Sequence, residues 1–232
     1  MILFEVYNNW LIAIAFCVLA YLIGSIPFSL VIGKSLTKKD LRDYGSGNIG
    51  STNALRVYGK KIGFLIFVFE VLKGAIIPAL VKYVFDGLIF ANPIPPIFYG
   101  FLAVIGHLFP IYIKFKGGKV VATSLGVLLA LCPSSAIFCL VVFITTVLIC
   151  GYVSVASTFA GISAIFMAWI QYFFGVETTN PGLMYLFGKL DLVTPVFCTV
   201  MLAIILIRHI PNYKRLSKGT EHSFKQKKEN SK

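Results

Sequence analysis

The sequence contains little charge and few acidic residues. Only 13% of its 232 residues are charged, and nine are aspartate or glutamate. A soluble domain carries about 25% charged residues, so this composition excludes an ordinary soluble globular protein. Hydrophobic residues make up 58% of the chain. We therefore predict an all-α integral membrane protein.

Metal-binding and disulfide patterns are also missing from the sequence. The five cysteines lie in or beside apolar runs, and they form no C-x-x-C pair. Cysteines in such places usually behave as small buried hydrophobic residues. We therefore expect no metal site and no cofactor.

The apolar runs predict a single multi-span membrane domain, since a span needs ~20 apolar residues. Seven spans are predicted at about 10–33, 62–84, 97–113, 120–132, 135–151, 157–174 and 193–209. The run 120–132 is short, and a re-entrant half-helix there would leave six spans. A basic tail, 210–232, follows the last span.

The distribution of cations predicts the orientation in the membrane. Of the 21 lysines and arginines, 18 lie in three segments, which are 34–61, 114–119 and the chain from Arg208. The positive-inside rule places all three segments in the cytoplasm. Seven spans satisfy this rule with the N-terminus outside and the C-terminus in the cytoplasm, whereas six spans put one basic segment on the wrong side. We expect membrane lipids, and not nucleic acid, as the partner of these cations.

The first cytoplasmic segment, "DYGSGNIGSTNALRVYGKK", combines glycines, hydroxyls, amides and cations. Glycines let backbone N–H groups converge on one point, and an arginine near a helix N-terminus favours an anion. The segment therefore predicts an anion site, with Ser51, Thr52 or Asn53 capping the helix that follows. A glycine-rich turn with a capped helix explains the same composition without a ligand.

Three further segments carry polar residues to the cytoplasmic side. The stretch Lys116 to Lys119 sets two glycines between lysines, although it is not a nucleotide-binding P-loop pattern. "RHIPNYKRLSKGTE" places polar residues three apart near the end of the last span, with Pro211 expected to open the helix there. "GYVSVAST", from Gly151, adds hydroxyls, which also serve plain helix packing. The one-sided distribution of these residues favours an enzyme over a transporter of a phosphorylated anion, which is the alternative.

Charged residues inside the second predicted span need partners. Glu70 and Lys73 are three residues apart, and because an unpaired charge in a membrane is costly, we predict that they pair. His107, near the inner end of the third span, is expected to be a hydrogen-bonded interface residue.

Three motifs of this chain resemble those of the bacterial acyl-phosphate:glycerol-3-phosphate acyltransferase family, known as PlsY. They are "SGNIGSTNALR", "GHLFPIYIKFKGGKVVAT" and "RHIPNYKRLSKGTE". The likeness extends to "GSIPF" and to "EVLKG", where the family usually has aspartate for Glu70. Val120 replaces a usual glycine, Gly151 stands where a basic residue is common, and Ser51 replaces a usual alanine.

The resemblance implies seven spans, an external N-terminus and a site open to the cytosolic leaflet of the bacterial inner membrane. It implies transfer of a fatty acyl group from acyl phosphate to the 1-hydroxyl of glycerol 3-phosphate. The products are lysophosphatidic acid and phosphate, in the first acylation of phospholipid synthesis, and an enzyme that supplies acyl phosphate is an implied partner. The implied catalytic residues are Ser46, Arg56, Lys119, His209 and Asn212. The implied substrate-binding residues are Asn48, Asn53, Lys116, Gly117, Gly118, Ser154, Ser157, Arg215 and Glu221.

The implied chemistry needs no covalent intermediate, because acyl phosphate is already an activated mixed anhydride. Cations and backbone N–H groups hold the two phosphates, and orientation of the hydroxyl supplies much of the catalysis. No histidine here is followed five residues later by the aspartate that many glycerolipid acyltransferases use. The proton acceptor is therefore His209 or the substrate's own phosphate, and we favour the phosphate, with His209 as a positioning residue.

Overall fold

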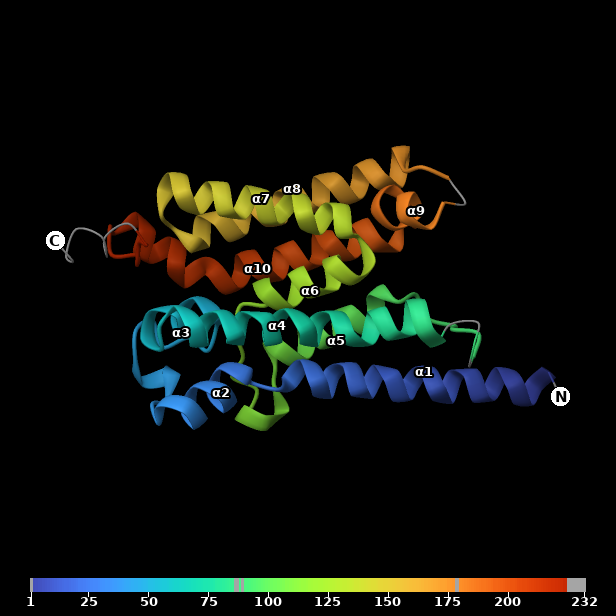
Figure 1. Ribbon diagram of the computed structural model, residues 1–232, viewed down its shortest axis with the longest axis horizontal. Coiled ribbons are helices and arrows are strands. Elements are labelled where there is room, and N and C mark those ends of the chain that lie inside the picture. Colours follow the sequence, from blue (N-terminus) through green and yellow to red (C-terminus); the bar gives the residue numbers. More distant parts are fainter. Residues whose placement is uncertain (1, 86–87, 89, 178–179, 225–232) are drawn as a thin grey trace. The chain divides into compact units, whose positions relative to one another are not determined.

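The structure, a computed structural model, describes residues 2–85, 88, 90–177 and 180–224. Over this part of the chain the regular elements are helices (Figure 1). The chain divides into two compact units, Met1–Leu131 and Cys132–Lys232. Among the described residues, five helices are long and apolar enough to cross a membrane by length and composition, namely Tyr7–Ser25, Lys60–Phe85, Pro133–Cys150, Val153–Phe174 and Val193–Ser217.

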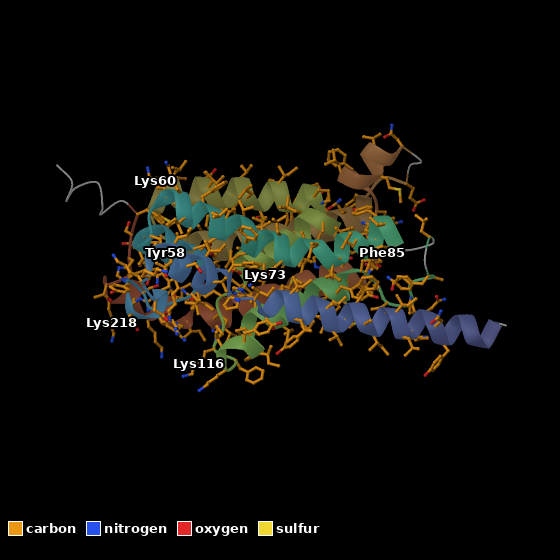
Figure 2. All side chains as sticks on the ribbon, turned by 60° about the horizontal axis from the view of Figure 1, so that its bottom comes forward. Tyr58, Lys60, Lys73, Phe85, Lys116 and Lys218 are labelled. Atoms are coloured by element: carbon orange, nitrogen blue, oxygen red, sulfur yellow. The ribbon has the colours of Figure 1, made fainter. Side chains whose placement is uncertain are left out.

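The described residues of the first unit form six α-helices joined by turns and loops. The helices are α1 (Ile2–Ser25), α2 (Phe28–Thr37), α3 (Ser51–Val57), α4 (Lys60–Leu80), α5 (Ile97–Leu108) and α6 (Val121–Leu131). Turns of 3₁₀ helix lie at Leu41–Asp43 and Ile111–Ile113, and α4 runs on into a π-helical turn at Val81–Phe85. Figure 2 shows Lys60 and Phe85 toward opposite ends of the helix formed by α4 and its π-helical turn, with Lys73 between them.

Small residues allow these helices to pack closely. A Cβ added at Gly24 of α1 would collide with the carbonyl of Ala103 on α5, and one at Gly126 of α6 would collide with the carbonyl of Val71 on α4. Close backbone approach through small residues is the usual way in which helices associate in a membrane. The pairs α1–α5 and α4–α6 therefore form the frame of the first unit (Figure 1).

The predicted span 10–33 is not one helix. The structure ends α1 at Ser25 and begins α2 at Phe28. Proline has no N–H, and it disfavours helical backbone at the residue before it, so Pro27 interrupts the helix although hydropathy continues across it. The carbonyl of Ile26 at this break accepts a hydrogen bond of 2.9 Å from Lys73 Nζ.

The second unit contains four helices in its described residues. These are α7 (Pro133–Cys150), α8 (Val153–Phe174), α9 (Pro181–Phe187) and α10 (Val193–Ser217). Gly151, with φ of 80°, lets the chain turn between α7 and α8, which pack together, and α10 packs on α8. Gln171 joins α8 to α7, because its Oε1 accepts a bond of 3.1 Å from Ser135.

The last helix is longer than the sequence predicted. Pro211 lies inside α10 and does not open it, and the helix continues to Ser217. The first part of the predicted tail 210–232 is therefore helical. Contacts of α10 with Glu221 hold this extension, as described below. The stretch "KQKKENSK" lies outside the described residues.

Candidate active site

The loop before α3 is organised by one buried amide, that of Asn53. Its Nδ2 lies 3.3 Å from the carbonyl oxygen of Leu41 and 3.0 Å from those of Tyr44 and Asn48. Its Oδ1 accepts a 3.0 Å hydrogen bond from the backbone N–H of Ser46. Because the amide has two N–H groups, the three carbonyls share them. Asn53 thereby ties both ends of the loop to α3.

The rest of this loop presents polar groups at the surface. Gly45 and Gly47 adopt left-handed backbone conformations, with φ of 62° and 69°, which glycine takes without strain. Ser46, Asn48 and Arg56 are each partly accessible. The predicted side-chain cap of α3 is absent in the described structure: Gly50 occupies the N-cap position, with no side-chain hydrogen bond.

A surface ion pair fixes the start of the same loop. Asp40 accepts hydrogen bonds from the backbone N–H, Nε and Nη2 of Arg42, at 3.0, 2.9 and 2.7 Å. These bonds hold the pKa of Asp40 well below its usual range. Tyr58 (Figure 2) bonds to the carbonyl of Lys39 at 3.0 Å, and burial is the main cause of the raised pKa of its hydroxyl. The hydrogen bond from Tyr58 thus links the entry of the loop to the end of α3.

The glycine-lysine loop lies between α5 and α6. Lys116 is exposed on this loop (Figure 2), Lys119 is partly buried, and the Gly118 N–H donates to the carbonyl of His107 at 3.2 Å. Val120 is buried and has φ of 59°. A β-branched residue in this conformation is a genuine outlier, with a strain on the order of 1–3 kcal/mol. Val120 therefore stands at a position that glycine would take without strain.

In the second unit, the carboxylate of Glu221 contacts three other predicted site residues. It accepts hydrogen bonds from Asn212 Nδ2 at 2.7 Å and from Arg215 Nε at 2.8 Å, and Ser154 Oγ lies 3.4 Å away. Glu221 is 6% exposed. The chain after α10 is thereby bound to α10 and to the first turn of α8. Ser157, also on α8, donates to the carbonyl of Val153 at 2.9 Å.

His209 is buried on α10, one turn before Asn212. Its Nδ1 lies 2.8 Å from the carbonyl oxygen of Ile205. A carbonyl only accepts hydrogen bonds, so Nδ1 carries the proton and Nε2 is the basic nitrogen of the neutral ring. The helix backbone therefore fixes the tautomer of His209.

The buried polar group around Glu70 was predicted only in part. The predicted pair exists, with Lys73 Nζ 2.7 Å from Glu70 Oε2, and the same oxygen lies 2.9 Å from His107 Nδ1. Sequence reasoning missed the contact between Glu70 and His107, because no spacing relates residues on different helices. Among the described residues, no group of three His, Cys, Asp or Glu side chains could hold a metal ion.

Comparison with known proteins identifies the family. The family model described as Glycerol-3-phosphate acyltransferase matches residues 14–219. Glycerol-3-phosphate acyltransferase 2 of Bacillus anthracis is 40% identical over 207 residues, covering 89% of this chain and 96% of the relative. The chain belongs to the glycerol-3-phosphate acyltransferase family. Another member, from Lactococcus lactis subsp. lactis, is 39% identical over 202 residues, covering 87% of this chain and 88% of the relative.

Solved structures of this acyltransferase family have the same fold. The crystal structure of PlsY, an integral membrane glycerol 3-phosphate acyltransferase, in its glycerol 3-phosphate form matches with a TM-score of 0.75. The two chains are 37% identical, and the match covers 91% of this chain and 95% of PlsY. The lysophosphatidic acid form matches with a TM-score of 0.72 and 36% identity over the same shares. Membership in the PlsY family and the integral membrane class, both expected from the sequence, are confirmed.

Proposed function

We propose that this protein is an acyltransferase that moves a fatty acyl group from acyl phosphate to the 1-hydroxyl of glycerol 3-phosphate. The products are lysophosphatidic acid and phosphate. The observation that carries the proposal is the match to PlsY over nine-tenths of the chain, since that protein has forms named for glycerol 3-phosphate and for lysophosphatidic acid. None of the relatives named above is described as a transporter.

The first unit supplies the groups that bind phosphate in this proposal. Arg56 is partly accessible beside the ordered loop, and Lys119 follows two glycines at the start of α6. Arginine grips phosphate through two N–H groups, whereas lysine acts as a point charge. We assign Arg56, Lys116 and Lys119 to the substrate phosphates and the departing phosphate, with Ser46 and Asn48 as neutral donors.

Asn53 and Glu221 act by holding polar segments in place. Each is buried, and each uses its polar atoms on the protein's own groups. We keep the Gly117–Gly118 turn, Ser154 and Ser157 as proposed substrate contacts; in the structure the Gly118 N–H and both hydroxyls are held by bonds to the protein's own groups. Preorganised donors contribute most to catalysis when they do not have to move during the reaction.

His209 orients the attacking hydroxyl in this mechanism. Its Nδ1 is anchored to the Ile205 carbonyl, and the ring positions the glycerol of the substrate, while the proton of the attacking hydroxyl faces a substrate phosphate oxygen. The hydroxyl oxygen attacks the acyl carbonyl carbon, the bond from that carbon to the phosphate oxygen breaks, and inorganic phosphate leaves. The hydroxyl proton passes to a substrate phosphate oxygen. Asn212 supports this arrangement through its bond to Glu221.

We also propose a topology of seven crossings in a bacterial inner membrane, with the N-terminus outside and the site at the cytoplasmic face. The support is the gathering of cations in the segments 34–61, 114–119 and the chain from Arg208. Single cysteines in a cysteine-free background test this arrangement. Those at Lys60 and Lys116 should react from the cytoplasm, and one at Leu88 from outside. Labelling of position 116 from outside would contradict the seven-span topology.

Donor selectivity tests the function. Purified protein is supplied with glycerol 3-phosphate and either acyl phosphate or acyl-CoA, and lysophosphatidic acid is quantified. We expect efficient product formation only with acyl phosphate, because no predicted element serves an adenine nucleotide. Efficient use of acyl-CoA would move the protein to another acyltransferase class. Flux of glycerol 3-phosphate into vesicles without acyl product would establish a transporter instead.

A further inference from the structure

A buried ionic group in the first unit takes no part in the mechanism above. Glu70 Oε2 lies 2.7 Å from Lys73 Nζ and 2.9 Å from His107 Nδ1. The side chains of Lys73, Glu70 and His107 are only 1%, 2% and 6% exposed. Charged groups inside membrane helices are expensive and usually serve a function. The contacts of these three side chains with neighbouring elements therefore indicate their function.

His107 supports the glycine-lysine loop directly. The backbone N–H of Gly118 donates to the His107 carbonyl at 3.2 Å. A Cβ added at Gly118 would collide with His107 Nε2, and one at Gly117 would collide with the carbonyls of His107 and Leu108. The two glycines thus lie against the end of α5, and one edge of the imidazole faces Gly118.

The opposite edge of the imidazole is held by the ion pair. His107 Nδ1 lies 2.9 Å from the Glu70 carboxylate, a distance at which a protonated Nδ1 pairs with it. Glu70 is held in turn by Lys73, whose ammonium also donates to the Ile26 carbonyl at the break between α1 and α2. The ring is fixed at one edge by these contacts and meets the loop at the other.

We propose that His107 is a positioning residue of the acyl-transfer reaction. Anchored by Glu70 and Lys73, its ring sets the place of Gly118 and hence the direction of Lys119. This inference rests on the proposed function, because it gives Lys119 a substrate phosphate to meet. Such a role differs from simple helix packing, because packing alone does not require one edge of the ring to contact Glu70 and the other to contact Gly118.

Two variants separate the two edges of the ring. His107→Phe keeps a ring beside Gly118 and loses the contact with Glu70. His107→Asn keeps an N–H near the place of Nδ1 and loses the far edge. The matched control is Tyr99→Phe on the same helix, α5, which removes a partly buried 2.8 Å hydrogen bond from Tyr99 to Asn92. Melting temperature, hydrogen exchange and kinetics are measured for all three variants.

We expect both His107 variants to speed amide exchange at residues 116–120 and to lower kcat/KM at least tenfold, at a melting temperature similar to that of Tyr99→Phe. A displacement of about 1 Å in a catalytic group is enough for an effect of up to ~10²-fold. Exchange in α4 and in the rest of α5 should stay as in the control, and Tyr99→Phe should retain activity.

Three results would overturn the proposal. Normal loop exchange and activity in His107→Phe would mean that the Glu70 anchor is unnecessary. The same result in His107→Asn would mean that the ring does not place the loop. Faster exchange throughout α4 and α5, with equal losses in the control, would reduce His107 to a packing residue. Hydrogen exchange reads loop position even if the wild type makes no lysophosphatidic acid, so failure of the proposed function is recognised separately.

Discussion

Replacement of Asn53 by aspartate tests how the first polar loop is held. The two side chains have nearly the same shape, but an ionised aspartate has no N–H to donate. It would face the carbonyl oxygens of Leu41, Tyr44 and Asn48, all of which lie 3.0–3.3 Å from Asn53 Nδ2 in the wild type. Only the bond from the Ser46 N–H to Oδ1 can remain.

The magnitude follows from these contacts. Two donated hydrogen bonds contribute ~1 kcal/mol each, and leaving buried carbonyls unsatisfied adds on the order of 1 kcal/mol more. The loop should therefore open more easily by about 3 kcal/mol. Since 1.4 kcal/mol is a factor of ten, the opening equilibrium should rise about a hundredfold. The loss is local, because the affected bonds lie within one loop and the start of α3.

Hydrogen exchange resolved to residues 44–50 measures this effect, with lysophosphatidic acid formation as the second readout. Asn48→Asp is the matched control for exchange, since the Asn48 side chain accepts from the Gly50 N–H at 3.2 Å and aspartate preserves an acceptor. We expect loss of loop protection and of activity for Asn53→Asp, and retained protection for Asn48→Asp. Wild-type protection and activity in Asn53→Asp would refute the role given to this amide.

Other substitutions address the remaining site residues. Arg56→Ala and Lys119→Ala should each lower activity about tenfold to a hundredfold in the acylation assay, because each removes a charge-assisted hydrogen bond of ~1.5–3 kcal/mol, and Arg56→Lys should restore only part of it. His209→Gln should keep measurable turnover if the ring only orients substrate; a loss of ~10²–10⁴-fold in the same assay would make it the general base. Glu221→Gln should destabilise the junction after α10 by about 1 kcal/mol, because the amide keeps an acceptor for Asn212 but loses the charge near partly exposed Arg215, and local hydrogen exchange measures this change.

The sequence predicted the structure best where a feature depends on one continuous segment. Long apolar runs predicted helices, and the i,i+3 spacing of Glu70 and Lys73 predicted their pairing, which the structure confirms. The break at Ile26–Pro27 was missed because hydropathy is continuous across it. The continuation of α10 through Pro211 was also missed. The contacts of Asn212 and Arg215 with Glu221 lie beyond the local sequence pattern around this proline.

Contacts between distant segments could not be read from composition. The resemblance to the PlsY family implied substrate binding for Asn53 and Glu221, and that role stays a prediction. The structure adds contacts that composition could not show, because Asn53 bonds to backbone carbonyls up to twelve residues away and Glu221 bonds to side chains on two helices. The link from Glu70 to His107 depends in the same way on how α4 and α5 pack. The left-handed backbone of Val120 could not be predicted from composition either.

The central claim is direct acyl transfer from acyl phosphate to glycerol 3-phosphate. Rapid-quench measurement of phosphate and lysophosphatidic acid over the first turnover, with purified protein in lipid nanodiscs, tests it most directly. We expect the two products to appear together in equal amounts, and no phosphate burst when glycerol 3-phosphate is omitted. A burst equal to the enzyme concentration from acyl phosphate alone would contradict direct transfer by revealing an acyl-enzyme, and phosphate release without any lysophosphatidic acid would contradict the acyltransferase assignment itself.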